Sequence, residues 1–424
     1  MAILRAALGL AFIILVAWLV AERRARIPWR IVAWGIGGQV LLALLILRTE
    51  PGRETMQLAA AFVNRLVGMA RPGAELVFGP LADPAAMAGT FGPARAFVFA
   101  FAGTGLVVII FFAALMSVLY HLGVMQRVTW VVARMLSATF GVSGAEALAM
   151  AATVFVGQAE SPLVVRPYLA RMTRSELNCL MTGGFATLAG SVLAVYIGMV
   201  GKRWAPDLLA ASIMSAPAAL LIAKVMLPET GQPMTAGRVP FVVERQSNNL
   251  IEAAVTGTRD GLQLYLNVIA MLIAFLGLLA LIDWPLGALG GWLGVPELSL
   301  AWLLGWLLAP LAWLMGIDGW HDARLFGSLL GLKIAANEFL AYERLIHLFP
   351  GSGEALVFQH ERSAGMAIYA LCGFANFGSI GIQLACIPPL APERGAEIAQ
   401  LALRAMIGGA LATCMTATVA GAFL

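Results

Sequence analysis

The chain has 424 residues, of which 61% are hydrophobic and 12% are charged, and its formal net charge is +4. A soluble domain carries about 25% charged residues, so the composition excludes a soluble globular protein. Apolar runs of about 20 residues recur along the whole length and predict a polytopic helical membrane protein. No basic run contains interleaved aromatic residues, so no nucleic-acid partner is expected.

The first predicted span covers residues 4–21, and residues 31–47 return across the membrane. Residues 4–21 lack a small-residue cleavage site, so we interpret them as a span and not as a signal peptide. The loop between the two spans contains Arg23, Arg24, Arg26 and Arg30. Because positively charged loops stay on the cytoplasmic side, the N-terminus is predicted to lie outside the cytoplasm.

Residues 54–70 carry apolar side chains at helical spacing with polar ones between them, which predicts an amphipathic helix at a membrane interface. Residues 72–93 are rich in glycine and proline and are predicted to form a loop. Residues 95–121 then span inward. Residues 122–140 are predicted to form a second interfacial helix, on the cytoplasmic side.

A run of uncharged residues leads into Gly157-Gln158-Ala159-Glu160-Ser161-Pro162. Gly157 and Pro162 favour a break in the helix, and a charge such as Glu160 at membrane depth normally faces a protein interior or a water-filled cavity. Broken backbone at that depth survives only where protein buries it or where it lines a cavity. We therefore predict a re-entrant hairpin over about residues 143–173 that forms half of a substrate site.

Two spans are predicted after this hairpin, at residues 177–200 and 207–227. Residues 228–260 are the most polar stretch and are predicted to form a cytoplasmic loop and surface helix. Residues 261–282 then span outward, and residues 283–297 are predicted to form a loop rich in Trp, Gly and Pro.

An internal repeat relates the two halves of the chain. Residues 184–192 resemble residues 373–380, and each segment follows a charged break in an apolar stretch. The second break holds Asn337 and Glu338, inside a second predicted hairpin over about residues 322–350. Hairpins that enter from opposite sides are typical of an inverted repeat, whose substrate lies at the repeat interface near the middle of the membrane. The alternative is that the small residues only pack helices.

Residues 298–317 are apolar enough to span, yet Pro310 and several tryptophans suit an interface. The repeat makes this segment the mirror of residues 122–140 and favours an interfacial helix. The predicted fold is an all-α polytopic membrane protein, an inverted-repeat transporter with two re-entrant hairpins and two unwound helices. Its expected parts are residues 1–121 (scaffold), 122–227 (first transport repeat), 228–297 (cytoplasmic loop and scaffold span) and 298–424 (second transport repeat).

Both hairpin breaks and both unwound spans would bring polar side chains to one point: Gln158, Glu160, Asn337, Glu338, Asn376 and Ser379. Amides offer paired donors and acceptors, and carboxylates accept hydrogen bonds from hydroxyl groups. Phe374 and Phe377 add aromatic faces for a flat ring. No arginine stands among these residues, which argues against a phosphorylated substrate. The set suits a neutral, polyhydroxylated ligand with a planar amide edge, such as a nucleoside.

Each polar residue also has a purely structural interpretation. Glu160 could pair with Arg166, Glu338 could pair with Lys333, and the asparagines could cap broken helix ends. A membrane enzyme that uses Glu160 and Glu338 as general acid and base is a further alternative, but the sequence shows no nucleophile or metal-ligand set beside them. The four cysteines lie in apolar segments without metal spacing, so no cofactor is expected.

Six motifs occur in order: IFFAALMSVLY at 110–120, GQAESPL at 157–163, ATLAGSV at 186–192, NEFLAY at 337–342, CGFANF at 372–377 and LAPER at 390–394. On these motifs the chain resembles a concentrative nucleoside transporter of the short bacterial type. The resemblance implies a homotrimer in a bacterial inner membrane, with eight spans per protomer and both termini periplasmic. It also implies a transport domain that moves against a scaffold.

The resemblance further implies roles toward the nucleoside. The residues at the base would be Gln158, Ala159, Glu160 and Phe374. The residues at the sugar would be Glu338 and Asn376, which hold ribose hydroxyls, and Ser379, which reaches the 5′ side. The residues that support the hairpin breaks would be Gly157, Pro162 and Asn337.

Two positions depart from the family pattern. Ala159 stands where the family usually has Thr or Ser, which leaves base preference open. Thr153 stands where sodium-coupled members have Asn, in a sodium site whose other positions are Val156, Thr187 and Leu188. A hydroxyl is a poorer sodium ligand than an amide carbonyl, so we expect coupling to H⁺ or Na⁺ with protons favoured, and Glu338 or Glu160 as the proton acceptor. An uncoupled nucleoside uniporter is the remaining alternative.

Overall fold

The computed structural model describes residues 2–22, 27–83, 86, 89, 107–239, 247–350 and 356–424. Within these ranges all regular structure is helical, which confirms the predicted all-α class. Five of the described helices are long and apolar enough to cross a membrane, and there are up to seven spans if each of two bent helix pairs counts as one. The chain is therefore a multi-pass membrane protein.

The described part of the N-terminal region contains α1 (Ala2–Leu19), α2 (Trp29–Ala43), α3 (Glu50–Phe78) and α7 (Val108–His121). A π-helical turn (Leu44–Arg48) extends α2, and a 3-10 turn (Gly79–Ala82) follows α3. A single helix, α15 (Leu250–Leu293), joins the two repeats.

The first repeat begins with α8 (Val124–Phe140), which bends by 79° from α7. Its hairpin consists of α9 (Gly144–Val156), α10 (Ser161–Val164) and α11 (Arg166–Leu169). A broken span, α12 (Arg174–Ala186) and α13 (Gly190–Val200), and an unbroken one, α14 (Ala205–Met226), complete the repeat.

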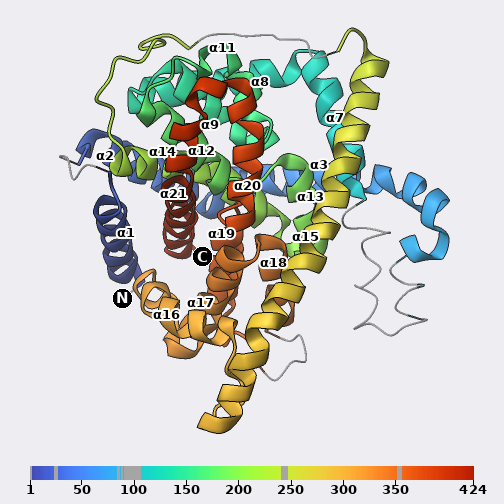
Figure 1. Ribbon diagram of the computed structural model, residues 1–424, viewed down its shortest axis with the longest axis vertical. Helices are drawn as coiled ribbons and strands as arrows, with labels where there is room; N and C mark the ends of the chain where they lie inside the picture. The colour runs from blue at the N-terminus through green and yellow to red at the C-terminus, as the bar shows by residue number, and fades with distance from the viewer. Residues whose placement is uncertain are drawn as a thin grey trace.

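The second repeat follows the same order. It begins with α16 (Leu300–Leu314), which turns by 118° into the hairpin of α17 (Gly319–Ala335) and α18 (Glu338–His347). A broken span, α19 (Glu361–Leu371) and α20 (Phe377–Cys386), and an unbroken one, α21 (Gly395–Gly421), close the chain. In Figure 1 the first hairpin lies at one end of the molecule and α16 and α17 lie at the other, with α15 along one side. This arrangement confirms the predicted fold class.

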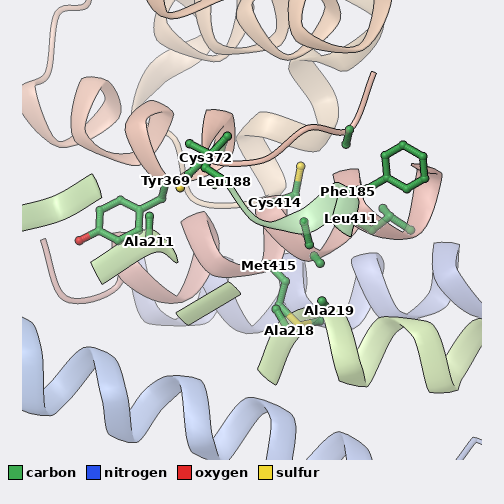
Figure 2. Packing of buried hydrophobic residues seen from close by; sticks show 14 of the residues in the cluster. Phe185, Leu188, Ala211, Ala218, Ala219, Tyr369, Cys372, Leu411, Cys414 and Met415 are labelled. Atoms are coloured by element: carbon green, nitrogen blue, oxygen red, sulfur yellow. The ribbon is translucent and has the colours of Figure 1, made fainter. Parts of the chain in front are cut away.

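The hydrophobic core surrounds the break in α12. Figure 2 shows residues of α12, α14, α19 and α21 and of the two breaks packed there: Phe185, Leu188, Ala211, Ala218, Ala219, Tyr369, Cys372, Leu411, Cys414 and Met415. The break therefore lies inside protein and not in lipid, which irregular backbone at membrane depth requires.

Buried polar contacts anchor the base of the first hairpin. Ser143 starts α9 with a capping box, in which Glu146 accepts a hydrogen bond from the Ser143 N–H. Glu146 also forms an ion pair with Lys224 of α14, and both side chains are at most 2% exposed. Because a broken buried ion pair leaves an uncompensated charge, this contact fastens the hairpin to α14.

Two segments predicted as loops are helical. α3 continues through Pro72 to Phe78, and α15 continues through Pro285 to Leu293. The loop predictions for residues 72–93 and 283–297 are therefore wrong in these parts. Proline removes only one hydrogen bond from a helix, and Pro72 and Pro285 are both exposed, so neither ring clashes with a neighbouring element and both helices continue. Most of residues 84–106, including the start of the span predicted at 95–121, lies outside the described residues.

Candidate functional site

The first hairpin reverses between α9 and α10. Gly157 follows the end of α9 with φ at 81°, a left-handed conformation that favours glycine. A Cβ at Gly157 would lie 2.7 Å from the Cβ of Ala189 in the α12–α13 break, so glycine also permits the close approach of hairpin and break. Pro162 occupies the first turn of α10, where proline is tolerated.

The second hairpin breaks between α17 and α18. The Asn337 side chain accepts a hydrogen bond from the N–H of Leu340 at 2.9 Å and caps α18. Asn337 therefore caps a broken helix end, as its structural interpretation from the sequence predicted. Glu338 is the first residue of α18 and is buried, so its carboxylate lies at the electropositive end of a helix.

The two broken spans cross at their breaks. Residues 187–189 separate α12 from α13, and residues 372–376 separate α19 from α20. A Cβ at Gly373 would lie 2.9 Å from backbone atoms of Ala186 and Phe185, so only glycine lets the two backbones approach this closely. Half-helix ends from both repeats therefore meet at one place.

The Glu338 carboxylate has partners from both repeats. Tyr196 of α13 donates its hydroxyl to Oε1 at 2.9 Å, and Asn376 donates its side-chain N–H to Oε2 at 2.9 Å. The Asn376 oxygen accepts from the N–H of Ser379 at 2.8 Å and so caps α20. An ionised carboxylate offers about four lone-pair positions, so about two remain for hydroxyl groups of a ligand.

Lys333 is buried but serves a different group. Its ammonium donates to the Ala370 carbonyl at 2.9 Å and to the Thr413 hydroxyl at 3.0 Å. A positive charge at the C-terminal end of a helix such as α19 is favourable. Within the described residues neither alternative ion pair, Glu338–Lys333 or Glu160–Arg166, is formed.

Gln158 lies buried at the tip of the first hairpin and contacts the second repeat. Gln383 of α20 donates to the Gln158 side-chain oxygen at 3.3 Å and to the Met181 carbonyl at 3.0 Å. Gly184 leaves room for this contact, because a Cβ there would lie 2.8 Å from both Gln158 Cβ and Gln383 Nε2. The first hairpin, α12 and α20 therefore meet at a single amide pair.

One face of α20 joins the tips of both hairpins. Asn376, Ser379 and Gln383 are spaced by three and four residues, so they share that face. Asn376 holds Glu338 and Gln383 holds Gln158. Seven residues at about 1.5 Å each separate the two contacts by about 10 Å along the helix. A carboxylate and an amide from opposite hairpins are thus set at the two ends of one surface.

Glu160 is exposed and lines a cavity of about 150 Å³. The cavity lies between the first hairpin and α7, α13 and α15, and its polar lining includes Tyr120, Ser191 and Asp260. The other two predicted base contacts, Ala159 and Phe374, are half-buried.

The four positions of the expected sodium site lie where α9 meets the α12 break, and all are buried: Thr153, Val156, Thr187 and Leu188. The Thr187 hydroxyl lies 3.0 Å from the Thr153 carbonyl and 2.9 Å from the Gly183 carbonyl, and it can donate to either. The Thr153 hydroxyl donates to the Met150 carbonyl of its own helix at 2.8 Å. Protein hydrogen bonds therefore already join α9 to the break.

Tyr196 and Gln383 also belong to this site, although neither was predicted from the sequence. Gln383 carried a signal, since it lies seven residues after Asn376 and therefore on the same helical face. Tyr196 carried none, because a tyrosine in an apolar span is equally typical of core packing.

Three family models match the chain in succession. Residues 8–81 match the N-terminal model of the Na⁺ dependent nucleoside transporters, and residues 207–421 match the C-terminal model of the same family. Residues 104–203 match a model described as nucleoside recognition. Together these models cover most of the chain, including both hairpins and both broken spans.

The chain is 42% identical to an uncharacterized transporter of Haemophilus influenzae, over 100% of this chain and 98% of that protein. It is 40% identical to rat solute carrier family 28 member 3 over 97% of its length, which is 57% of that longer protein. Solved structures of CNTnw in an inward-facing substrate-bound state and in an outward-facing state match with TM-scores of 0.91 and 0.90; each is 39% identical over 100% of this chain and 98% of that chain. These relatives are transporters and not enzymes. The chain therefore belongs to the family of Na⁺ dependent nucleoside transporters.

Proposed function

We propose that this protein imports nucleosides across the inner membrane of a bacterium together with a cation, by alternating access. The observation that carries the proposal is the surface of α20, whose contacts with Glu338 of one hairpin and Gln158 of the other lie about 10 Å apart along the helix. That spacing and chemistry suit a ligand with hydroxyl groups at one end and a hydrogen-bonding ring at the other. Inward- and outward-facing structures of the related CNTnw support alternating access.

The proposed contacts follow from these positions. Glu338 and Asn376 bind ribose hydroxyls, because the carboxylate keeps free lone pairs after its contacts with Tyr196 and Asn376. Ser379, one turn further along α20, reaches the 5′ side of the sugar. The base lies against Gln158, Ala159, Glu160 and Phe374.

We propose that the two repeats move as one body against a scaffold of α3, α7 and α15. α7 packs along α15, and the repeats adjoin this scaffold where α13 contacts α7 and α3, α14 contacts α3, and α8 contacts α7. α1 and α2 pack against α14 and α21 instead, so we place them with the moving body. This assignment changes the scaffold boundary expected for residues 1–121.

For the coupling ion we favour protons over sodium. Glu160 opens onto the cavity, where a carboxylate can exchange a proton with water. Thr153 offers a hydroxyl where sodium-coupled members have Asn, and a hydroxyl is a poorer sodium ligand than an amide carbonyl. Glu338 is the second candidate proton acceptor.

We propose a homotrimer whose protomers have both termini on the periplasmic side. α15 supports an assembly, since it exposes large apolar side chains along its length, including Leu262, Ile273 and Leu281. Mass measurement of the detergent-solubilised protein tests the assembly, and a monomeric mass would refute it.

The orientation is tested by fusing to the C-terminus a reporter that is active only in the cytoplasm. Activity of that reporter would refute a periplasmic C-terminus.

Glu338→Gln tests the substrate site. The glutamine keeps the shape but removes the charge and replaces one of the two accepting oxygens by an NH2 group, so fewer lone pairs remain for ligand hydroxyl groups beside Tyr196 and Asn376. Hydrogen bonds to charged groups contribute about 1.5–3 kcal/mol, so we expect uridine to bind the purified variant at least about tenfold more weakly.

The matched control is Glu176→Gln, which alters an equally buried glutamate in the capping box of α12. It should lower the melting temperature and leave uridine affinity unchanged. Equal uridine affinity in wild type and Glu338→Gln would refute the assignment of this surface as the binding site.

A further inference from the structure

Gln383 of the second repeat donates a hydrogen bond to Gln158 at the tip of the first hairpin. We infer that Gln383 fixes the orientation of the Gln158 amide and so makes the site select nucleosides whose base carries a carbonyl, and not an amino group, at the end far from the sugar. The inference rests on the proposed function, because it needs the base to lie against Gln158.

The orientation follows from the order of donors and acceptors. The Met181 carbonyl can only accept a hydrogen bond, so the atom of Gln383 that lies 3.0 Å from it is the amide nitrogen. The same nitrogen lies 3.3 Å from the Gln158 side chain. Because that nitrogen donates to both neighbours, the facing atom of Gln158 is its oxygen. The Met181 backbone carbonyl, which cannot exchange acceptor for donor, therefore fixes the orientation of both side-chain amides.

The Gln158 nitrogen then points away from Gln383. It has no hydrogen-bond partner in the part of the chain that the structure describes. Its two N–H groups are therefore available to a ligand, and the site presents a donor at this point. Rotation of the amide would place an N–H against the donating nitrogen of Gln383, and burial makes such an unpaired contact costly.

The end of the base that meets this donor follows from the position of Gln158 along α20. Glu338 and Asn376 hold the sugar at the start of the helix, and Gln158 is held two turns further on. The ring position furthest from the sugar is position 4 of a pyrimidine or position 6 of a purine. Uridine and inosine carry a carbonyl there, which accepts, whereas cytidine and adenosine carry an amino group, which donates.

The test compares uridine with cytidine, and inosine with adenosine, as competitors of labelled uridine uptake. A single neutral hydrogen bond supports a preference of about three- to tenfold, so wild type should favour uridine and inosine by that factor. Gln383→Met keeps the volume but removes the donor, which frees the Gln158 amide to rotate. Both preferences should then fall to about twofold or less.

Gln39→Met is the matched control. Gln39 is also buried, and its nitrogen donates to the Met214 carbonyl and to the Thr416 hydroxyl, each at 3.0 Å. Its loss should lower stability without changing either preference. Gly184→Ala is a second test variant, because its Cβ would displace the same amide pair, and it should reduce the preferences as Gln383→Met does.

The wild-type comparison needs no variant to fold. Equal competition by all four nucleosides, or stronger competition by cytidine and adenosine, would overturn the inference and leave nucleoside transport intact. Unchanged preferences in Gln383→Met would overturn it as well. Absence of uptake of every nucleoside would instead refute the proposed function, on which the inference rests.

Discussion

The Glu338 carboxylate is held at both oxygens by side chains from different repeats. Tyr196 fixes one oxygen and Asn376 the other. The Tyr196 ring also stacks on Tyr342 of α18 with 4.5 Å between centroids, so packing and hydrogen bonding place the hydroxyl together. A preorganised acceptor of this kind avoids the entropy cost of ordering on binding.

Tyr196→Phe removes only the hydroxyl that donates to Glu338. Because the stacked ring remains, we expect a small change in melting temperature and about tenfold weaker uridine binding, in line with a lost hydrogen bond to a charged group. Tyr342→Phe is the control, since the Tyr342 hydroxyl donates to the Ile368 carbonyl and not to Glu338. If both variants bind uridine like wild type, Tyr196 has no part in positioning Glu338.

At the scale of single residues, the sequence predicted the polar residues at the helix breaks better than the residues that bind to them. Glu338, Asn376 and Gln158 stood out because polar groups inside apolar runs are costly. Tyr196 belongs to the same site but is joined to it only by the crossing of distant helices, about which residue type and spacing say nothing. Gln383 shares a helical face with Asn376 by spacing, but its contact with Gln158 also depends on that crossing.

Among the elements, the two crossed breaks set the geometry of the site. The backbones meet at Gly373 and Ala186, and the half-helices that end and begin there present Asn376 and Ser379. Glycine and proline predicted where helices break, because each has a local backbone cause. The same rule failed at Pro72 and Pro285, where the helix continues although proline removes one of its hydrogen bonds.

Gly373→Ala should separate the two breaks. Its Cβ would lie 2.9 Å from the backbone of the neighbouring repeat, and overpacking of this kind costs about 1–3 kcal/mol. We expect a lower melting temperature and loss of most nucleoside uptake.

The control is Gly381→Ala on α20, whose Cβ meets nothing within 4 Å. It should fold and transport normally. Normal uptake in Gly373→Ala would show that the crossing of the breaks is not needed for transport.

For the whole molecule, hydropathy predicted a multi-pass helical protein, and the repeat predicted two hairpins from opposite ends, as Figure 1 shows. The division into moving and fixed parts was harder to predict from the sequence. α1 and α2 precede both repeats in sequence, yet they pack on α14 and α21 of those repeats. Chain order therefore does not reveal which body a helix belongs to, because helices far apart in sequence share one core.

The most direct test of cation-coupled nucleoside import is uptake of labelled uridine and adenosine into proteoliposomes, under an inward proton gradient and, separately, under an inward sodium gradient. We predict accumulation above equilibrium under the proton gradient alone, with uridine favoured. Accumulation driven only by sodium would overturn the choice of ion and place the coupling at Thr153 and Thr187. Uptake that only equilibrates would indicate a uniporter, and absence of uptake of both nucleosides under both gradients would contradict the account itself.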